Sequence, residues 1–240
     1  MRIVSLVPSW TEYLVDLGLE DQLVGRTKFC VRAGHQPEGI TRIGGTKSLH
    51  LDRIESLQPD LVIAAKEENV REQVEACTAF SEVLLTDVRD VQGAFEWLET
   101  VAEQAGRKTA GQAWRDKIEK AWGHPRPVME RAYYVIWQKP LMVAGHDTYI
   151  HSVMKWWGIE NAASMDSTER YPTLEPDNEA HMECRRMLLS SEPFPFNASH
   201  CAAFAEKGIA SRCVDGEAFS WYGSRMLHAV DYLRGVATAE

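Results

Sequence analysis

The chain has 240 residues, of which 45% are hydrophobic and 25% charged, and its formal net charge is −9. An acidic chain without clustered Lys and Arg lacks the charge that phosphate backbones attract, which argues against a nucleic-acid partner. No stretch approaches the roughly 20 apolar residues that span a bilayer, so membrane insertion is not expected.

The cysteines and the N-terminus bear on the compartment. The five cysteines are odd in number and include no Cys-x-x-Cys pair, so neither a disulfide framework nor a zinc knuckle is predicted. The apolar run 3–7 follows Met1 and Arg2 directly, without the pattern of a signal peptide. We therefore expect a cytoplasmic protein from the sequence as it stands, or a periplasmic one if a signal segment has been removed.

The first half of the sequence alternates short apolar runs with segments of helical periodicity. The run 3–7 predicts a strand, and Ser9 is expected to cap a helix that ends at Gly18. Further strands are predicted at 23–25, 42–44, 61–65 and 82–85, and further helices at 51–57, 69–80 and 91–105. Strands that alternate with helices indicate a mostly parallel sheet.

A long helix and a second alternation follow. Residues 107–122 have helical periodicity that only Gly106 and Gly111 weaken, and the Gly and Pro residues of 123–127 end it. Strands are then predicted at 132–137, 187–190 and 211–214, and helices at 149–157, 199–207 and 225–233. The predicted fold class is α/β, with two Rossmann-like lobes (1–105 and 125–240) whose mostly parallel sheets are joined by one long backbone helix (106–124).

Three stretches of the first half carry a resemblance to a known family. They are Arg2–Ser9 followed by Thr11 and Glu12, then Leu23–Gly25, and the phrase Ile54–Val62 with its Gln-Pro-Asp turn. In these residues the sequence resembles the substrate-binding proteins of ABC importers for cobalamin, haem and ferric siderophores, also called helical-backbone metal receptors, which have the class III periplasmic-binding-protein fold. The resemblance implies that a ligand is bound between two lobes without being transformed, that no cofactor is required, and that Glu55 and Glu175 dock onto an ABC permease.

The loops at the carboxyl ends of the predicted strands are where a ligand is expected, because open parallel sheets bind ligands there. Aromatic rings beside fixed charges in these loops suit a large planar ligand, with a corrinoid first and haem or a ferric siderophore next. The alternative for each ring is ordinary packing under a loop. The predicted ligand-binding residues are Thr27, Lys28, Phe29, Cys30, Lys47, Lys66 and Glu67 in the first lobe, and Trp137, Lys139, His146, Arg170, Tyr171, Glu192, Phe194, Trp221 and Tyr222 in the second.

Two residues leave an enzymatic or regulatory alternative open. Lys28 near Cys30 could lower the pKa of the thiol and create a nucleophile, although a small buried thiol is the favoured alternative. His146 beside Asp147 could be a metal ligand oriented by a carboxylate, or could only cap the helix that begins at Tyr149. No standard catalytic motif and no zinc-like histidine spacing occurs, so no catalytic and no bare-metal site is predicted. The rival hypothesis is a cytosolic enzyme or regulatory protein on the same scaffold.

Overall fold

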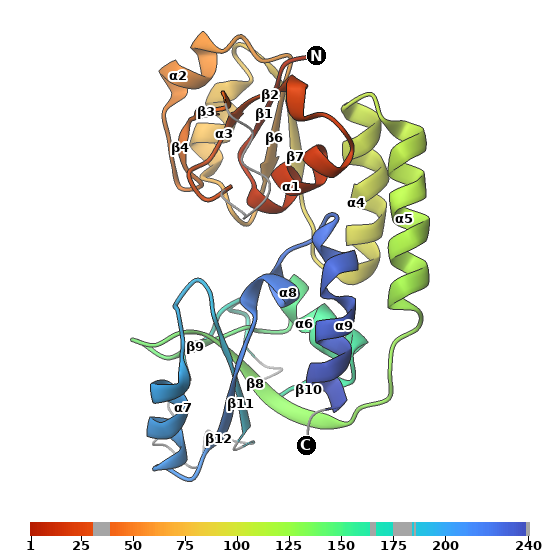
Figure 1. The fold of residues 1–240 in the computed structure, drawn as a ribbon. Coiled ribbons are helices and arrows are strands. Elements are labelled where there is room, and N and C mark those ends of the chain that lie inside the picture. Colours follow the sequence, from red (N-terminus) through yellow and green to blue (C-terminus); the bar gives the residue numbers. More distant parts are fainter. Residues whose placement is uncertain (31–38, 164–166, 175–183, 185, 239–240) are drawn as a thin grey trace. The chain divides into compact units, whose positions relative to one another are not determined.

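The computed structural model describes residues 1–30, 39–163, 167–174, 184 and 186–238. The chain forms two compact units, coloured by sequence in Figure 1. None of the helices within the described ranges is long and apolar enough to cross a bilayer. The first unit comprises Met1–Val88, Gln92–Ala121 and Tyr222–Leu227, and the second comprises Arg89–Val91, Trp122–Trp221 and His228–Glu240. The chain therefore returns to the first unit near its end, and the predicted lobe boundaries at 105 and 125 stay a prediction.

The first unit is built on a five-stranded parallel sheet with the order β3-β2-β1-β6-β7. Its central strands β1 (Ile3–Ser5) and β6 (Leu61–Ala65) are buried along their whole length, as expected of strands covered on both faces. The other elements are α1 (Pro8–Asp16), η1 (Glu20–Gln22), β2 (Leu23–Arg26), β3 (Thr41–Arg42), the antiparallel pair β4 (Gly44–Gly45) and β5 (Ser48–Leu49), α2 (Leu51–Ser56), α3 (Arg71–Cys77) and β7 (Glu82–Thr86).

Two helix starts differ from the prediction. Helix α1 begins at Pro8 with Val7 as its N-cap and without a side-chain cap, so the expected cap at Ser9 is wrong. Proline fits the first helical position because the N–H it lacks would have no partner there. Helix α3 begins at Arg71 instead of Asn69, since the Asn69 side chain is used to bind neighbouring loops, as described below.

The helices α4 (Val91–Gln104) and α5 (Lys108–Trp122) pack against each other. A Cβ atom at Gly111 would collide with the side chain of Ala102, so glycine permits the close approach of the two helices. The Leu98 carbonyl of α4 accepts a hydrogen bond of 3.1 Å from the Tyr13 hydroxyl of α1. The long helix predicted at 107–122 is present, and the glycine that weakens its pattern has a packing role.

The segment Tyr222–Leu227 is attached to α1 of the first unit. Arg225 forms a buried ion pair with Glu12, in which the Arg225 Nε atom donates to Glu12 Oε2 at 3.1 Å. The Tyr222 ring packs on Trp10 with ring centroids 4.7 Å apart. These contacts join residues more than 200 positions apart in the sequence.

The second unit contains four parallel strands in the order β10-β8-β11-β12, with β9 antiparallel to β8. The prediction missed three short elements, β9, β10 and α8; α8 occupies a stretch expected to be a loop. The apolar core of this unit includes Tyr133, Val135, Met187, Leu189 and Phe196. The elements are β8 (Glu130–Trp137), β9 (Met142–Val143), α6 (Tyr149–Trp156), β10 (Ile159–Asn161), β11 (Arg186–Ser190), α7 (Ala198–Ala205), β12 (Ala210–Val214), α8 (Gly216–Ser220) and α9 (Arg225–Thr238).

Candidate functional site

In the first unit, Asn69 binds together the loops at the carboxyl edge of the sheet. Its Oδ1 atom accepts a hydrogen bond from the Ala65 N–H at 2.9 Å, where β6 ends. Its Nδ2 atom donates to the Leu6 carbonyl at 3.3 Å and to the Thr46 carbonyl at 3.0 Å. The Asn69 side chain is buried, so these bonds are shielded from water. The loop that follows β6 is thereby fixed to the loop that follows β1 and to the turn between β4 and β5.

Cys30 lies in the loop that follows β2 and is buried. Its sulfur is 3.0 Å from the Thr11 hydroxyl oxygen and 3.1 Å from the Thr27 hydroxyl oxygen, and the residue is 5% exposed. Burial raises the pKa of the Cys30 thiol, although these hydrogen bonds and the nearby Arg26 charge act in the opposite direction. The hypothesis that a lowered pKa activates the Cys30 thiol is therefore wrong. Cys30 is instead a small buried thiol.

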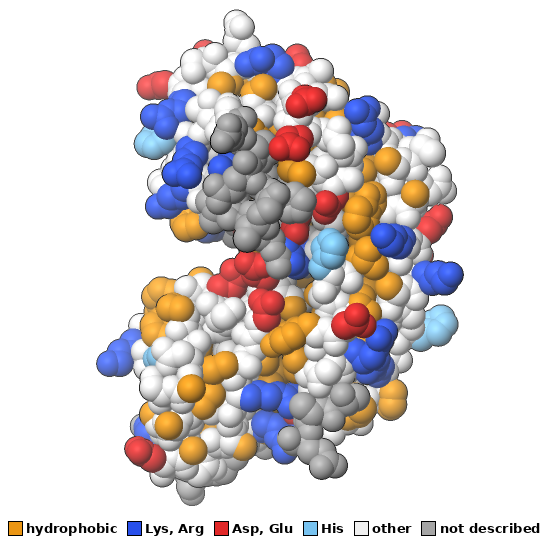
Figure 2. Space-filling view, in the orientation of Figure 1, with side chains coloured by type: hydrophobic (Ala, Val, Ile, Leu, Met, Phe, Trp, Pro, Cys, Tyr) orange, Lys and Arg blue, Asp and Glu red, His pale blue; other side chains and the backbone are white. Residues whose placement is uncertain are grey.

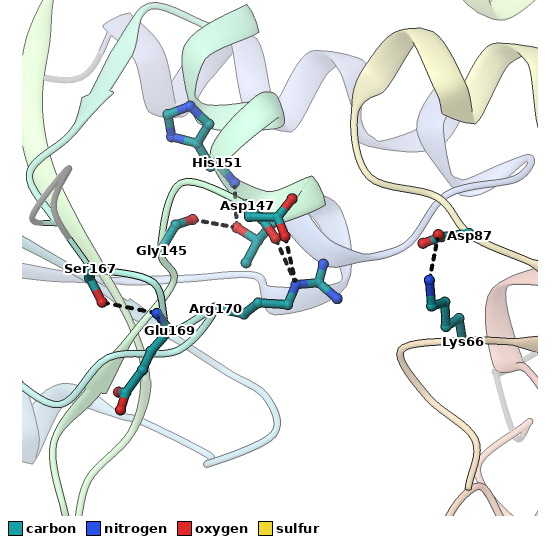
Figure 3. Close-up of polar contacts among 9 residues, drawn as sticks. Lys66, Asp87, Gly145, Asp147, His151, Ser167, Glu169 and Arg170 are labelled. Atoms are coloured by element: carbon teal, nitrogen blue, oxygen red, sulfur yellow. Dashed lines mark hydrogen bonds and ion pairs between the residues drawn. The ribbon is translucent and has the colours of Figure 1, made fainter. Parts of the chain in front are cut away.

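The exposed groups near this edge are an aromatic ring and several cations. Phe29 is 50% exposed, and the Lys28 ammonium lies 5.0 Å from its ring centroid. The Lys47 ammonium donates to the Glu67 carbonyl at 2.8 Å. Lys66 and Asp87 form an exposed ion pair of 3.1 Å, drawn in Figure 3. The face of this unit in Figure 2 shows acidic side chains as well as basic ones.

In the second unit, Glu192 is the centre of a polar network that begins where β11 ends. Glu192 Oε1 accepts hydrogen bonds from the Ser220 hydroxyl at 2.8 Å and from the Trp221 indole N–H at 2.9 Å. Its backbone carbonyl accepts from the Ser190 hydroxyl, which in turn accepts from Tyr134. Burial raises the pKa of Glu192, while the two hydrogen bonds to its carboxylate act to lower it.

The turn after β12 approaches this network closely. A Cβ atom at Gly216 would collide with the side chains of Glu192 and Ser190, so only glycine fits. The Gly216 N–H donates to the Ser191 hydroxyl at 2.9 Å. The loops after β11 and β12 are thus in direct contact at the carboxyl edge of the sheet.

An aromatic cluster lies at the end of β8. Trp137 is 40% exposed and meets Phe194 edge to face, with centroids 5.7 Å apart. Phe194 packs on Phe196, which is buried in the core, at 4.7 Å. The Trp137 indole N–H donates to the Lys139 backbone carbonyl at 3.2 Å. Trp137 therefore packs against Phe194 and leaves part of its ring exposed, as suits a ring that stacks on a ligand. Phe196, by contrast, is a packing residue.

His146 does not cap α6. That role belongs to Thr148, whose hydroxyl accepts from the His151 N–H at 3.1 Å. The His146 Nε2 atom lies 2.8 Å from the Ala163 carbonyl, and its ring lies 4.5 Å from that of His151. Asp147 interacts with Arg170, whose Nε atom donates to the Asp147 carbonyl at 2.7 Å. In the part of the chain that the structure describes, no three His, Cys, Asp or Glu side chains are grouped so that they could hold a metal ion.

The remaining predicted residues have varied surroundings. Tyr222 is buried against Trp10, and its hydroxyl lies 3.5 Å from a Glu68 carboxylate oxygen. Tyr171 is half-buried in a segment that pairs with β9. Glu55 is exposed on α2, whereas Glu175 lies outside the described residues.

Sequence reasoning missed the residues that hold the predicted ones in place. They are Asn69 in the first unit and Tyr134, Ser190 and Ser220 in the second. Asn69 and Ser190 could have been found from the sequence, because Ser190 ends a predicted strand and Asn69 lies shortly after the end of another.

Two α/β units, each with polar and aromatic loops at the carboxyl edge of a parallel sheet, define a ligand-binding protein of the two-sheet type. The family model described as "Periplasmic binding protein" matches residues 3–192. The chain belongs to this family, whose members are non-catalytic substrate-binding proteins.

Individual relatives agree with this assignment. The chain is 22% identical to the vitamin B12-binding protein of Pectobacterium carotovorum subsp. carotovorum, over 99% of this chain and 88% of that protein. The solved periplasmic haem-binding protein BhuT, in complex with two haems, superposes with a TM-score of 0.78 at 21% identity, covering 98% of this chain and 97% of that one. The vitamin B12-binding protein BtuF of Vibrio cholerae has a TM-score of 0.75 at 17% identity, covering 100% and 98%. The predicted fold class is confirmed.

Proposed function

We propose that this chain is the substrate-binding protein of an ABC importer and that its ligand is a corrinoid of the vitamin B12 class. Haem is the second candidate and a ferric siderophore the third. Family membership supports substrate binding, and the similarity to vitamin B12-binding and haem-binding proteins supports a metal-bearing macrocycle. The periplasmic relatives favour the periplasmic location over the cytoplasmic one.

The observation that carries the choice of a corrinoid is the carboxyl group of Glu192 among the aromatic loops of the second unit. Peripheral amides of a corrinoid donate hydrogen bonds, which a carboxylate accepts. Haem carries propionates instead, and a carboxylate repels them. Glu192 Oε1 is held by Ser220 and Trp221, so the position of the carboxyl group is fixed before a ligand arrives.

The aromatic groups supply the apolar part of the binding energy. Trp137 and Phe29 are 40% and 50% exposed, respectively, and can bury the faces of a macrocycle. Lys28, next to Phe29, supplies a donor for carbonyl oxygens of the ligand. We propose that the loops at the carboxyl edge of each sheet carry the residues that bind the ligand.

The enzymatic alternative is set aside. The family to which the chain belongs is non-catalytic. Cys30 is a buried thiol with a raised pKa, and His146 lies against a backbone carbonyl. An ABC permease follows from the proposed role, and docking through Glu55 stays a prediction.

A titration of the purified chain with cyanocobalamin, ferric haem and a ferric siderophore tests the proposal. Binding would be followed by ligand absorbance and by calorimetry. We expect saturable binding of cyanocobalamin at one ligand per chain, tighter than that of the other two. Tight binding of haem with none of cyanocobalamin would overturn the corrinoid assignment, and binding of none of the three would overturn the whole proposal.

A further inference from the structure

Two cysteine thiols of the second unit lie in contact. The sulfur atoms of Cys201 and Cys213 are 3.4 Å apart, although the residues are twelve positions apart in the sequence. Cys201 is on α7 and half-buried, and Cys213 is on β12 and exposed. Their sulfur atoms are about 1.4 Å further apart than the two sulfurs of a disulfide, a difference that a small side-chain rotation removes.

The backbone around the pair holds the two side chains toward each other. Ser211 and Cys213 alternate with Arg212 along β12, so both lie on the same face of the sheet. The Ser211 hydroxyl donates to the Cys201 carbonyl at 3.5 Å, which shows that α7 covers this face. The N-terminus of α7 is fixed by a capping box between Asn197 and His200. The two cysteines are therefore neighbours because of the fold.

We propose that Cys201 and Cys213 are a redox-modification site that forms an intramolecular disulfide by exchange with a small-molecule or protein disulfide. The inference concerns neither the ligand nor the residues proposed to bind it. The redox site goes beyond the proposed function, and its test does not depend on whether a corrinoid, haem or siderophore binds.

The reaction balances as two successive thiol–disulfide exchanges. The exposed Cys213 loses its proton and attacks one sulfur of the oxidant, which releases one thiol and leaves a mixed disulfide. Cys201 then loses its proton and attacks the Cys213 sulfur, and the second thiol leaves and takes up a proton. Two electrons pass from the cysteine pair to the oxidant, which is reduced to two thiols.

The surroundings of the pair indicate a slow and stable modification. Partial burial and the contact with Cys201 raise the pKa of the Cys213 thiol to about 11, so little thiolate is present at neutral pH. A thiol of high pKa is also a poor leaving group, which slows reduction of the finished disulfide. The disulfide would fix α7 to β12, which is the edge strand of the sheet.

The other three cysteines provide internal controls. Cys30 and Cys77 are buried in the first unit. Cys184 packs against the same core as Cys201, but its thiol donates to the Arg131 carbonyl at 3.0 Å. Cleavage after Lys and Arg places each cysteine in a separate tryptic peptide, with Cys201 in 187–207 and Cys213 in 213–225.

The test is incubation of the whole chain with oxidised glutathione at mildly alkaline pH, followed by alkylation, tryptic digestion and mass spectrometry. We expect the chain to remain monomeric, to lose two hydrogen atoms in mass, and to yield peptide 187–207 linked to 213–225. A reductant should reverse the change. The C184S variant should form the link as readily as the wild type, and C201S and C213S should not form it.

Two outcomes would overturn the proposal. One is a mixed disulfide between Cys213 and glutathione that persists in the wild-type chain because Cys201 does not displace the glutathione. Another is a link that involves Cys184 or that joins two chains. The mass of the wild-type chain decides the question even if a serine variant does not fold.

Discussion

Replacing Glu12 by glutamine removes the charge that neutralises Arg225. The two side chains are 5% and 7% exposed, and Arg225 donates to Glu12 through Nε and through a second nitrogen. After the substitution, the guanidinium remains buried and loses the charge of this carboxylate. The substitution therefore tests whether the returning segment Tyr222–Leu227 stabilises the first unit.

The expected loss of stability follows from the burial of the pair. Breaking a buried ion pair by removing one partner costs about 3–5 kcal/mol. An amide keeps one hydrogen-bond acceptor for Arg225, so we expect a value at the low end, about 3 kcal/mol. With a urea dependence of about 2 kcal/mol per molar, the unfolding midpoint should fall by about 1.5 M.

Urea unfolding followed by tryptophan fluorescence and circular dichroism measures this loss. The matched control is Glu75→Gln, which removes the exposed ion pair with Arg71 and should change the stability by about 0.5 kcal/mol or less. Combining Glu12→Leu with Arg225→Met removes both charges and should cost less than Glu12→Gln alone. A Glu12→Gln midpoint equal to that of the Glu75→Gln control would mean that the buried pair does not stabilise the fold.

Three further predictions follow. Burial lowers the pKa of His151 from an ordinary 6.5 to about 4, and the charges of His146 and Lys155 act in the same direction. Between pH 4 and pH 6.5, the His151 side chain therefore takes up a proton when the protein unfolds. The melting temperature should therefore fall as the pH drops from about 6.5 to about 4, and His151→Gln should flatten that dependence; equal slopes would contradict it. Glu192→Ala should weaken cyanocobalamin binding by about 10-fold to 100-fold, because it removes a hydrogen bond to a charged group. The control is Glu206→Ala, at an exposed residue just beyond the C-terminal end of α7, which should leave the affinity unaltered. Oxidation of Cys201 and Cys213 should stabilise the second unit by about 3 kcal/mol through loop closure, measured by urea unfolding with and without reductant; equal midpoints would count against it.

Periodicity and breaker residues were enough to predict the main elements of the fold. The apolar run 61–65 predicts β6, and the helical periodicity of 107–122 predicts α5. Short elements have too few residues to show a period, which is why β10, with three residues, and α8, with five, were missed. The start of α1 was misplaced because Ser9 was expected to cap the helix, whereas Pro8 is its first residue.

The site was predictable by region but not by the surroundings of each side chain. Position after a strand identified Trp137, Glu192 and Trp221 as neighbours of one sheet edge. The same reasoning could not distinguish the exposed Trp137 from the buried Tyr222, because the burial of Tyr222 depends on contact with Trp10, more than 200 positions away. Nor could it predict the raised pKa of the Cys30 thiol, which arises from tertiary packing.

We propose above that the ligand binds to loops at the carboxyl edges of the parallel sheets. Hydrogen exchange of the backbone amides, measured with and without saturating cyanocobalamin, tests it most directly. We expect slower exchange in 27–30 and 66–69 of the first unit and in 191–194 and 215–221 of the second. Protection confined to the amino edges of the sheets, or unchanged exchange in all four segments despite saturation, would contradict it.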